Sequence, residues 1–172
     1  GSTLFPSIDA LPMCDMVDLG ELCPSLVRLW VGLGWEKQID IDGDPYDLDV
    51  LAFCLDEGMR LPTKKDFVYH GNKQNTLKTV HHRDDFFQGL PQQDNETLML
   101  ELEHMREELH EVVFVVLIRE ARIKGQSFGQ MNSCYLRVYD KFNSRQRNLF
   151  KFDFMKNFRH LIDGEATAIE VG

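Results

Sequence analysis

The sequence lacks the cysteine patterns and long apolar runs that mark several protein classes. Its four cysteines, Cys14, Cys23, Cys54 and Cys134, form no CxxC pair, so they give little support to a zinc site or a redox motif. Cys54 and Cys134 lie inside apolar runs, which predicts buried free thiols rather than disulfides. No apolar run reaches the roughly 18 residues that a membrane-spanning helix needs. We therefore expect a cytoplasmic protein with no membrane span.

Positive charge is also scarce. The chain has 28 Asp and Glu against 19 Lys and Arg, which gives a formal net charge of -9. Such an acidic chain lacks the basic surface that nucleic-acid binding requires, and this argues against a nucleic-acid partner. We expect cations or basic protein surfaces as its partners.

Motifs of catalysis are missing as well. The sequence contains no HExxH, no GxSxG and no GK[ST] ending after the glycine-rich segment Gly125 to Gly129, which is more typical of a turn. His70, His81, His82 and Asp85 could form a transition-metal or hydrolytic centre, but their spacing matches no metal motif. We predict that the protein is not an enzyme, and we keep a metal-dependent hydrolase using His81, His82 and Asp85 as a minor alternative.

The length and the first residues indicate one domain preceded by an arm. At 172 residues and 20.0 kDa the chain is long enough for one domain with a sizeable core. It begins with Gly-Ser rather than Met, which resembles a tag scar and is compatible with a piece of a longer protein. Proline-rich residues 1–16 predict an extended arm, and residues 17–172 form the predicted domain.

Alternating apolar residues predict a mainly β protein. Strands are expected at residues 27–35, 46–57, 66–69, 98–102, 112–118, 133–140, 148–154 and 167–171, with a short strand near residues 16–19 and helical turns near residues 103–111 and 155–161. The continuous apolar run from Val112 to Ile118 predicts a strand buried on both faces. Residues 73–95 form a long polar connection of the kind that is usually functional or disordered. The pattern predicts a β-sandwich of two sheets with one or two short helices and long acidic loops.

Paired carboxylates mark the segment from Tyr46 to Glu57. Asp47 and Asp49 are two residues apart on a predicted strand, so their side chains share one face at about 7 Å. The two charges repel each other unless the side chains are solvated or a divalent cation lies between them. Asp42 and Asp44, which flank the turn just before this strand, are candidates for additional metal ligands.

Several segments together resemble one protein family. They are VRLWVGLGWE (residues 27–36), DGDPYDLD (42–49), DFVYHGN (66–72), DNE (94–96), VVFVVLIREA (112–121) and FGQMNSCYLRVYD (128–140). In this order and spacing they resemble the TerD family of tellurium-resistance and stress-response proteins, and the resemblance extends from about Val17 to the C-terminus. It implies a β-sandwich that binds calcium through acidic loops at one end.

The resemblance also implies a set of ligands. The positions that match the family's acidic motifs are Asp47, Asp49, Asn72, Asp85, Asp94, Asn95 and Glu96. All are oxygen donors, which favour calcium or magnesium over zinc or copper. Pro45, Phe86, Phe87 and Pro91 depart from the family pattern, so we expect one or two calcium ions with at least one weakened site. The alternative is that these acids form only a solvated face and turn caps.

The expected function follows from this resemblance. It is a non-catalytic calcium-binding domain of a tellurium-resistance or stress-response system, in which Ca²⁺ orders the acidic loops and so presents a surface to other proteins of that system. The alternative is a protein-interaction module with a degenerate or lost ion site. In that case Phe86 and Phe87 are candidate partner-binding residues, although the pair could instead fold back into a small satellite core.

Overall fold

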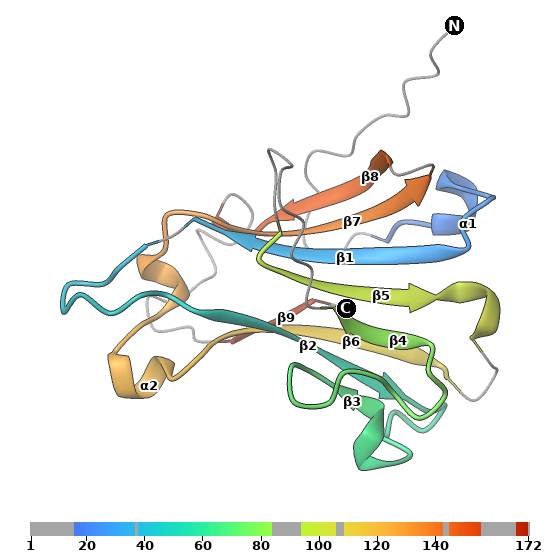
Figure 1. Ribbon diagram of the computed structural model, residues 1–172, viewed down its shortest axis with the longest axis horizontal. Helices are drawn as coiled ribbons and strands as arrows, with labels where there is room; N and C mark the ends of the chain where they lie inside the picture. The colour runs from blue at the N-terminus through green and yellow to red at the C-terminus, as the bar shows by residue number, and fades with distance from the viewer. Residues whose placement is uncertain are drawn as a thin grey trace, which may run out of the picture.

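The protein is a β-sandwich of two antiparallel sheets. The computed structural model describes residues 16–36, 38–83, 94–105, 109–142, 145–155 and 168–171. The strand order is β4-β5-β1-β7-β8 in the first sheet and β3-β2-β6-β9 in the second. The two sheets lie one above the other with their strands roughly aligned (Figure 1). The predicted fold class is confirmed.

The five-stranded sheet contains one strand that the sequence pattern did not reveal. Its strands are β4 (Val80–Arg83), β5 (Glu96–Glu101), β1 (Arg28–Trp35), β7 (Cys134–Phe142) and β8 (Arg145–Asp153). β4 falls inside the connection that was predicted to be a polar loop, because only its first residue is apolar. It pairs with β5, with His82 opposite Leu98, and therefore forms through a distant partner rather than through its own alternation.

The four-stranded sheet is apolar on both faces but buried mainly on one. Its strands are β3 (Phe67–Val68), β2 (Leu48–Leu55), β6 (Glu111–Ile118) and β9 (Ala168–Val171). In β6, Val116 and Ile118 belong to the core, whereas Val115 and Leu117 are only half-buried. Val113 on the same face as Val115 and Leu117 is buried, so on this face the prediction of burial is wrong only for Val115 and Leu117.

Helical elements are short. They are α1 (Leu19–Leu22), α2 (Ala121–Lys124) and the 3₁₀ turns η1 (Lys64–Asp66), η2 (Leu102–His104) and η3 (Phe128–Gln130). α1 replaces the short strand predicted near residues 16–19, because the Asp18 carboxylate caps it by accepting the N–H groups of Gly20 and Glu21. The predicted helix at residues 155–161 lies almost entirely outside the described residues. In the described part of the chain, no helix is long and apolar enough to span a membrane.

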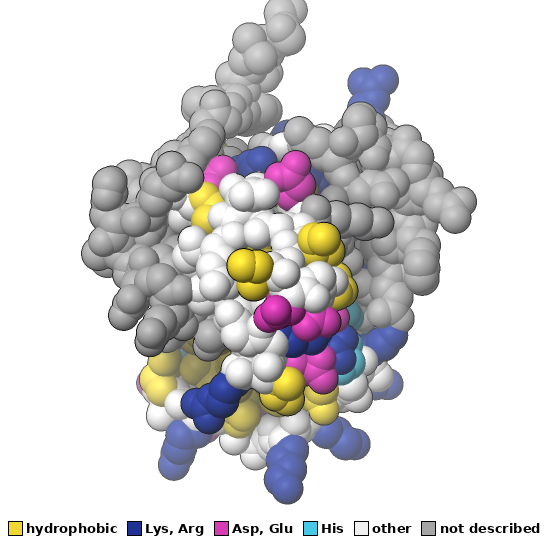
Figure 2. Space-filling model, turned by 90° about the vertical axis from the view of Figure 1, so that its left-hand side faces the viewer, with side chains coloured by type: hydrophobic (Ala, Val, Ile, Leu, Met, Phe, Trp, Pro, Cys, Tyr) yellow, Lys and Arg dark blue, Asp and Glu magenta, His cyan; other side chains and the backbone are white. Residues whose placement is uncertain are grey.

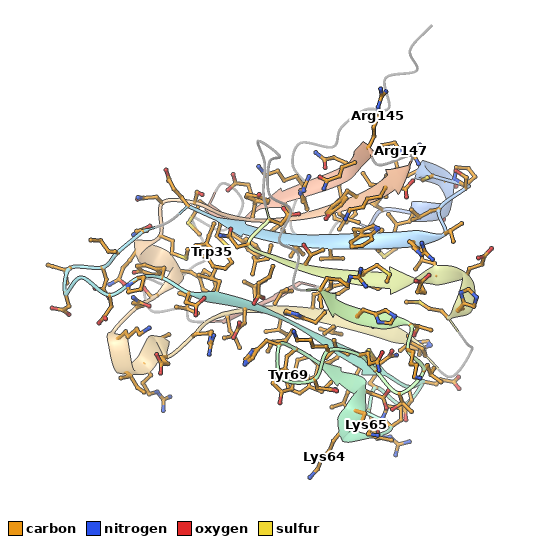
Figure 3. All side chains as sticks on the ribbon, viewed as in Figure 1. Trp35, Lys64, Lys65, Tyr69, Arg145 and Arg147 are labelled. Atoms are coloured by element: carbon orange, nitrogen blue, oxygen red, sulfur yellow. The ribbon has the colours of Figure 1, made fainter. Side chains whose placement is uncertain are left out.

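Two lysines of η1 are exposed, whereas the core lies between the two sheets. Lys64 and Lys65 extend away from the sandwich (Figure 3). The core between the sheets is formed by alternate residues of the strands, and fully buried members include Leu33 of β1, Val50 of β2 and Leu98 of β5. The hydrophobic area removed from water here is the main stabilising contribution.

The cysteines behave as predicted. Cys23, Cys54 and Cys134 are buried free thiols, and Cys14 lies outside the described residues. Burial, with a smaller contribution from Asp66, raises the pKa of Cys54 to about 12. A thiol with such a high pKa is a poor nucleophile at neutral pH.

Candidate functional site

The candidate site lies where β2 runs without a neighbouring strand on one side. β3 pairs with Ala52 and Phe53 of β2, and no other described strand pairs with the preceding residues of β2 on that side. The Val50 N–H donates a 2.7 Å hydrogen bond to Oε2 of Glu96, which belongs to the other sheet. The Glu96 carboxylate therefore bridges the two sheets beside Asp49.

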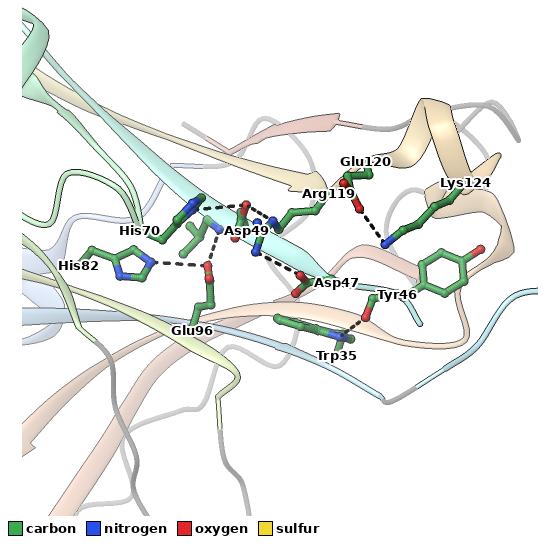
Figure 4. A network of polar contacts seen from close by, with 11 residues as sticks. Trp35, Tyr46, Asp47, Asp49, His70, His82, Glu96, Arg119, Glu120 and Lys124 are labelled. Atoms are coloured by element: carbon green, nitrogen blue, oxygen red, sulfur yellow. Dashed lines mark hydrogen bonds and ion pairs between the residues drawn. The ribbon is translucent and has the colours of Figure 1, made fainter. Parts of the chain in front are cut away.

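Arg119 supplies a positive charge between the two predicted aspartate ligands. Its Nη1 lies 3.3 Å from Oδ2 of Asp47, and its Nε lies 3.4 Å from Oδ2 of Asp49 (Figure 4). The Arg119 N–H also donates a 2.7 Å hydrogen bond to the Asp47 carbonyl oxygen, directly after the last β2–β6 pair. A guanidinium group of the protein itself thus occupies the position where the sequence predicted a divalent cation.

Two histidines flank the carboxylates. Nδ1 of His70 lies 3.7 Å from Oδ2 of Asp49, and Nε2 of His82 lies 3.7 Å from Oε2 of Glu96. The His82 side chain is only 4% exposed, and neither of its buried ring nitrogens has a hydrogen-bond partner among the described residues. Unsatisfied buried polar atoms are uncommon and costly. Of the side chains in this network, His82 is therefore the one whose buried nitrogens lack hydrogen bonds to described residues.

Burial raises the pKa of Asp49 to about 6. This value includes a smaller upward contribution from the adjacent Glu96 carboxyl, through like-charge repulsion and hydrogen bonding, and downward contributions from Arg119 and His70. Asp49 therefore retains a proton at a pH where an ordinary aspartate is fully ionised.

Asp94 lies away from this network, on the outer face of the five-stranded sheet. Its two carboxylate oxygens accept 2.7 Å hydrogen bonds from Nε and Nη2 of Arg137, and both side chains are 4% exposed. A Cβ atom at Gly32 would overlap the Asp94 carboxylate, so the glycine makes room for this ion pair. The Asp94 charge is thus balanced within the protein.

The two predicted amide ligands have structural roles. Asn95 Oδ1 accepts a 3.0 Å hydrogen bond from the Trp35 N–H. Asn72 Nδ2 donates hydrogen bonds to the carbonyl oxygens of Lys65 and Phe67, at 2.9 and 2.7 Å. Both side chains hold loops next to strand ends.

Of the seven predicted ligands, the structure brings three into one network: Asp47, Asp49 and Glu96. Asp85 lies outside the described residues, as do Phe86 and Phe87. Within the described ranges, no group of three or more His, Cys, Asp or Glu side chains has a metal-binding arrangement. The six described members of the predicted set therefore do not gather in one network, because Asp94, Asn95 and Asn72 have other partners.

Comparison with known proteins identifies the family. The TerD domain model matches residues 10–171 of the chain. The chain belongs to the TerD family. The family predicted from the sequence motifs is thus confirmed.

Two curated relatives and one solved structure illustrate the relationship. This TerD-family protein is 30% identical over 141 residues to "Tellurium resistance protein TerD" of Serratia marcescens, covering 82% of this chain and 72% of that one. It is 27% identical over 142 residues to "General stress protein 16U" of Bacillus subtilis (strain 168), covering 83% and 72%. The crystal structure of a homologue of telluride resistance protein (TerD) from Streptomyces coelicolor A3(2) superposes with a TM-score of 0.60 at 20% identity, covering 86% and 79%. At that identity the superposition shows the fold alone.

The candidate additional ligands of this TerD-family protein lie on an exposed loop. Asp42 and Asp44 are both exposed, and their backbone N–H groups donate to Oδ1 of Asp40 at 3.0 and 2.8 Å. Oδ2 of Asp40 accepts a 2.8 Å hydrogen bond from Gln126. Asp40, which the sequence analysis did not propose as a ligand, therefore shapes this loop.

Two arginines are the most important residues that the sequence reading missed. Arg119 directly follows the apolar run of β6, and Arg137 lies in the middle of β7. An arginine at the end or in the interior of a buried strand indicates a carboxylate partner, because such a charge is rarely left unpaired. The sequence alone does not indicate which carboxylate that is.

Proposed function

We propose that this TerD-family protein is a non-catalytic protein-interaction domain of a stress-response or tellurium-resistance system, in which Arg119 takes the place of a bound cation. The observation that supports this most directly is the pair of contacts from Arg119 to Asp47 and Asp49, at 3.3 and 3.4 Å. Its partners are other proteins of that system.

The physical argument concerns the repulsion between the two aspartates. Two carboxylates held close together destabilise the fold unless a positive charge compensates them. Arg119 supplies that charge, and its backbone is fixed by the hydrogen bond to the Asp47 carbonyl oxygen. The end of the sandwich around Asp47 is then ordered without an external ion, and the surface for a partner does not depend on calcium.

Calcium binding is the second candidate function, and the net charge of the network favours it. Asp47, Asp49 and Glu96 are three carboxylates, whereas Arg119 is the one permanent cation among the described residues that contact them. A calcium ion bound by these three side chains would require the Arg119 side chain to move away. The two candidates therefore make opposite predictions for the wild-type protein.

The deciding measurement is the thermal midpoint in excess EGTA and at about 1 mM free calcium, with magnesium as a control. A site with a dissociation constant of about 10 μM would stabilise the protein by about 2.7 kcal/mol and raise the midpoint by several degrees. We expect no shift for the wild type. A calcium-selective shift would contradict the proposal and support the second candidate.

The Arg119→Met variant tests the role of the guanidinium. Without it, Asp47 and Asp49 lose their counter-charge, so we expect the free energy of unfolding in EGTA to fall. The fall should be only about 1–2 kcal/mol, because the Arg119 side chain is partly exposed and solvent weakens its ion pairs. Calcium should now raise the thermal midpoint of the variant. Arg122→Met is the matched control, because Arg122 is exposed and forms no ion pair with the described residues of the network. An Arg119→Met variant as stable as this control would contradict the assigned role.

A further inference from the structure

The end of the sandwich that carries α2 displays three isoleucines to solvent. Ile39, Ile41 and Ile123 are 67%, 100% and 85% exposed. Isoleucine is among the most frequently buried residues, and single exposed apolar residues need no explanation. Here three of them lie at one end of the molecule, where Figure 2 shows hydrophobic side chains beside acidic and basic ones.

Hydrogen bonds connect the segments that carry these isoleucines. Residues 38–46, here called the isoleucine hairpin, contain Ile39 and Ile41. Gln126, which closely follows α2 and Ile123, donates from Nε2 to Oδ2 of Asp40 at 2.8 Å and to the carbonyl oxygen of Asp44 at 3.2 Å. The hairpin and the α2 segment are thereby joined into one surface.

The isoleucine hairpin holds one conformation through its own contacts. Ile39 and Pro45 form an antiparallel bridge, and the Asp40 N–H donates a 2.9 Å hydrogen bond to the Asp44 carbonyl oxygen. Gly43 has a φ of 88°, which glycine adopts without strain. Ile39 and Ile41 are therefore exposed on a hairpin whose backbone is held by its own hydrogen bonds.

Charge indicates what kind of partner this surface fits. Asp42 and Asp44 are exposed on the same hairpin, and neither forms an ion pair with a described residue. The whole chain carries a net charge of -9. Exposed carboxylates attract Lys and Arg side chains and accelerate the approach of a basic partner.

We propose that the isoleucine hairpin, together with Ile123, is a docking surface for a basic segment of a partner protein in which Lys or Arg alternates with apolar side chains. The apolar side chains of that segment contact the isoleucines, and its basic side chains pair with Asp42 and Asp44. This inference rests on the proposed interaction function and adds the surface and the chemistry of the partner.

A short labelled peptide in which lysine and leucine alternate is the probe. Its binding is measured by fluorescence anisotropy at about 0.15 M salt, beside a lysine–serine and a glutamate–leucine peptide. We expect the wild type to bind the lysine–leucine peptide at least tenfold more tightly than either control. Equal binding of the lysine–serine peptide would overturn the proposal, because attraction would then depend on charge alone.

Variants locate the binding on the hairpin. We expect Ile39→Ser with Ile41→Ser to weaken binding at least tenfold, and Asp42→Asn with Asp44→Asn to weaken it and reduce its salt dependence. Met59→Ser is the control, because Met59 is 51% exposed but lies beyond the opposite end of β2. Wild-type affinity in the isoleucine variant, with its thermal midpoint unchanged, would overturn this docking surface without affecting the role of Arg119. A thermal midpoint of the wild type that rises with calcium would overturn the role of Arg119 but would not change the interpretation of the peptide binding.

Discussion

At the scale of single residues, two arginines supply counter-charges to carboxylates. Arg119 pairs with Asp47 and Asp49, and Arg137 pairs with Asp94. Each arginine is distant in sequence from its carboxylate partners, so each pair forms only when the strands assemble. The Arg137 and Asp94 side chains are both 4% exposed, so removing either one leaves a buried charge uncompensated and should be strongly destabilising.

Asp49 predicts a specific dependence of stability on pH. Its folded-state pKa of about 6 lies above the ordinary value of 3.8, so the folded protein binds this proton more tightly than the unfolded chain. Its contribution to stability is full below about pH 4 and is lost as the pH rises through about 6. We expect Asp49→Asn to be more stable than the wild type by roughly 1–3 kcal/mol at about pH 8, with no such gain at about pH 4.

Urea unfolding at several pH values checks this prediction. Asp47→Asn is the control, because the Asp47 side chain is 48% exposed and should show a smaller effect. An Asp49→Asn variant that is less stable than the wild type at about pH 8 would show that the ionised carboxylate is stabilising there.

Gly32 should tolerate no side chain. A methyl group would overlap the Asp94 carboxylate and displace it from Arg137. We expect Gly32→Ala to lower the free energy of unfolding by about 2–4 kcal/mol, because it disturbs a buried ion pair. Gly58→Ala is the control, since its added carbon would meet only the flexible ends of Arg60 and Asp56. Equal stability of the two variants in urea would refute this role for Gly32.

At the scale of elements, the pairing of β4 explains an unusual residue. β4 pairs with β5, and this register places His82 opposite the core residue Leu98, where neither ring nitrogen has a hydrogen bond to the described part of the chain. His81, one residue earlier, is half-buried and its Nε2 lies 2.8 Å from the Lys78 carbonyl oxygen. The two adjacent histidines therefore differ because successive side chains of a strand point to opposite faces.

Replacing His82 by an apolar residue should not lower the free energy of unfolding. We expect His82→Leu to raise the free energy of unfolding by about 1–2 kcal/mol, because it removes unsatisfied buried polar atoms. His81→Leu, which loses a hydrogen bond, should show no gain. Thermal and urea unfolding of both variants measure this difference. Marked destabilisation by His82→Leu would reveal a polar partner of His82.

At the scale of the whole molecule, the sandwich brings β5 of one sheet close to β2 of the other. Glu96 of β5 accepts a hydrogen bond from the backbone of β2, so the acidic network connects the two sheets. The isoleucine hairpin continues from this region toward the end of the sandwich. A partner that binds the hairpin would therefore approach close to the Arg119 network.

The sequence by itself determined the sandwich, most of its strands and the family, because alternation of apolar residues and family motifs are local patterns. It also determined the buried thiols. It missed β4, whose strand conformation depends on pairing with β5. Only the tertiary structure decided which acids share a site. Asp47, Asp49 and Glu96 lie together, whereas Asp94 lies on the outer face of the five-stranded sheet and pairs with Arg137. The physical reason is that strand register sets which distant side chains meet, and electrostatic partners such as Arg119 carry no signal in sequence spacing.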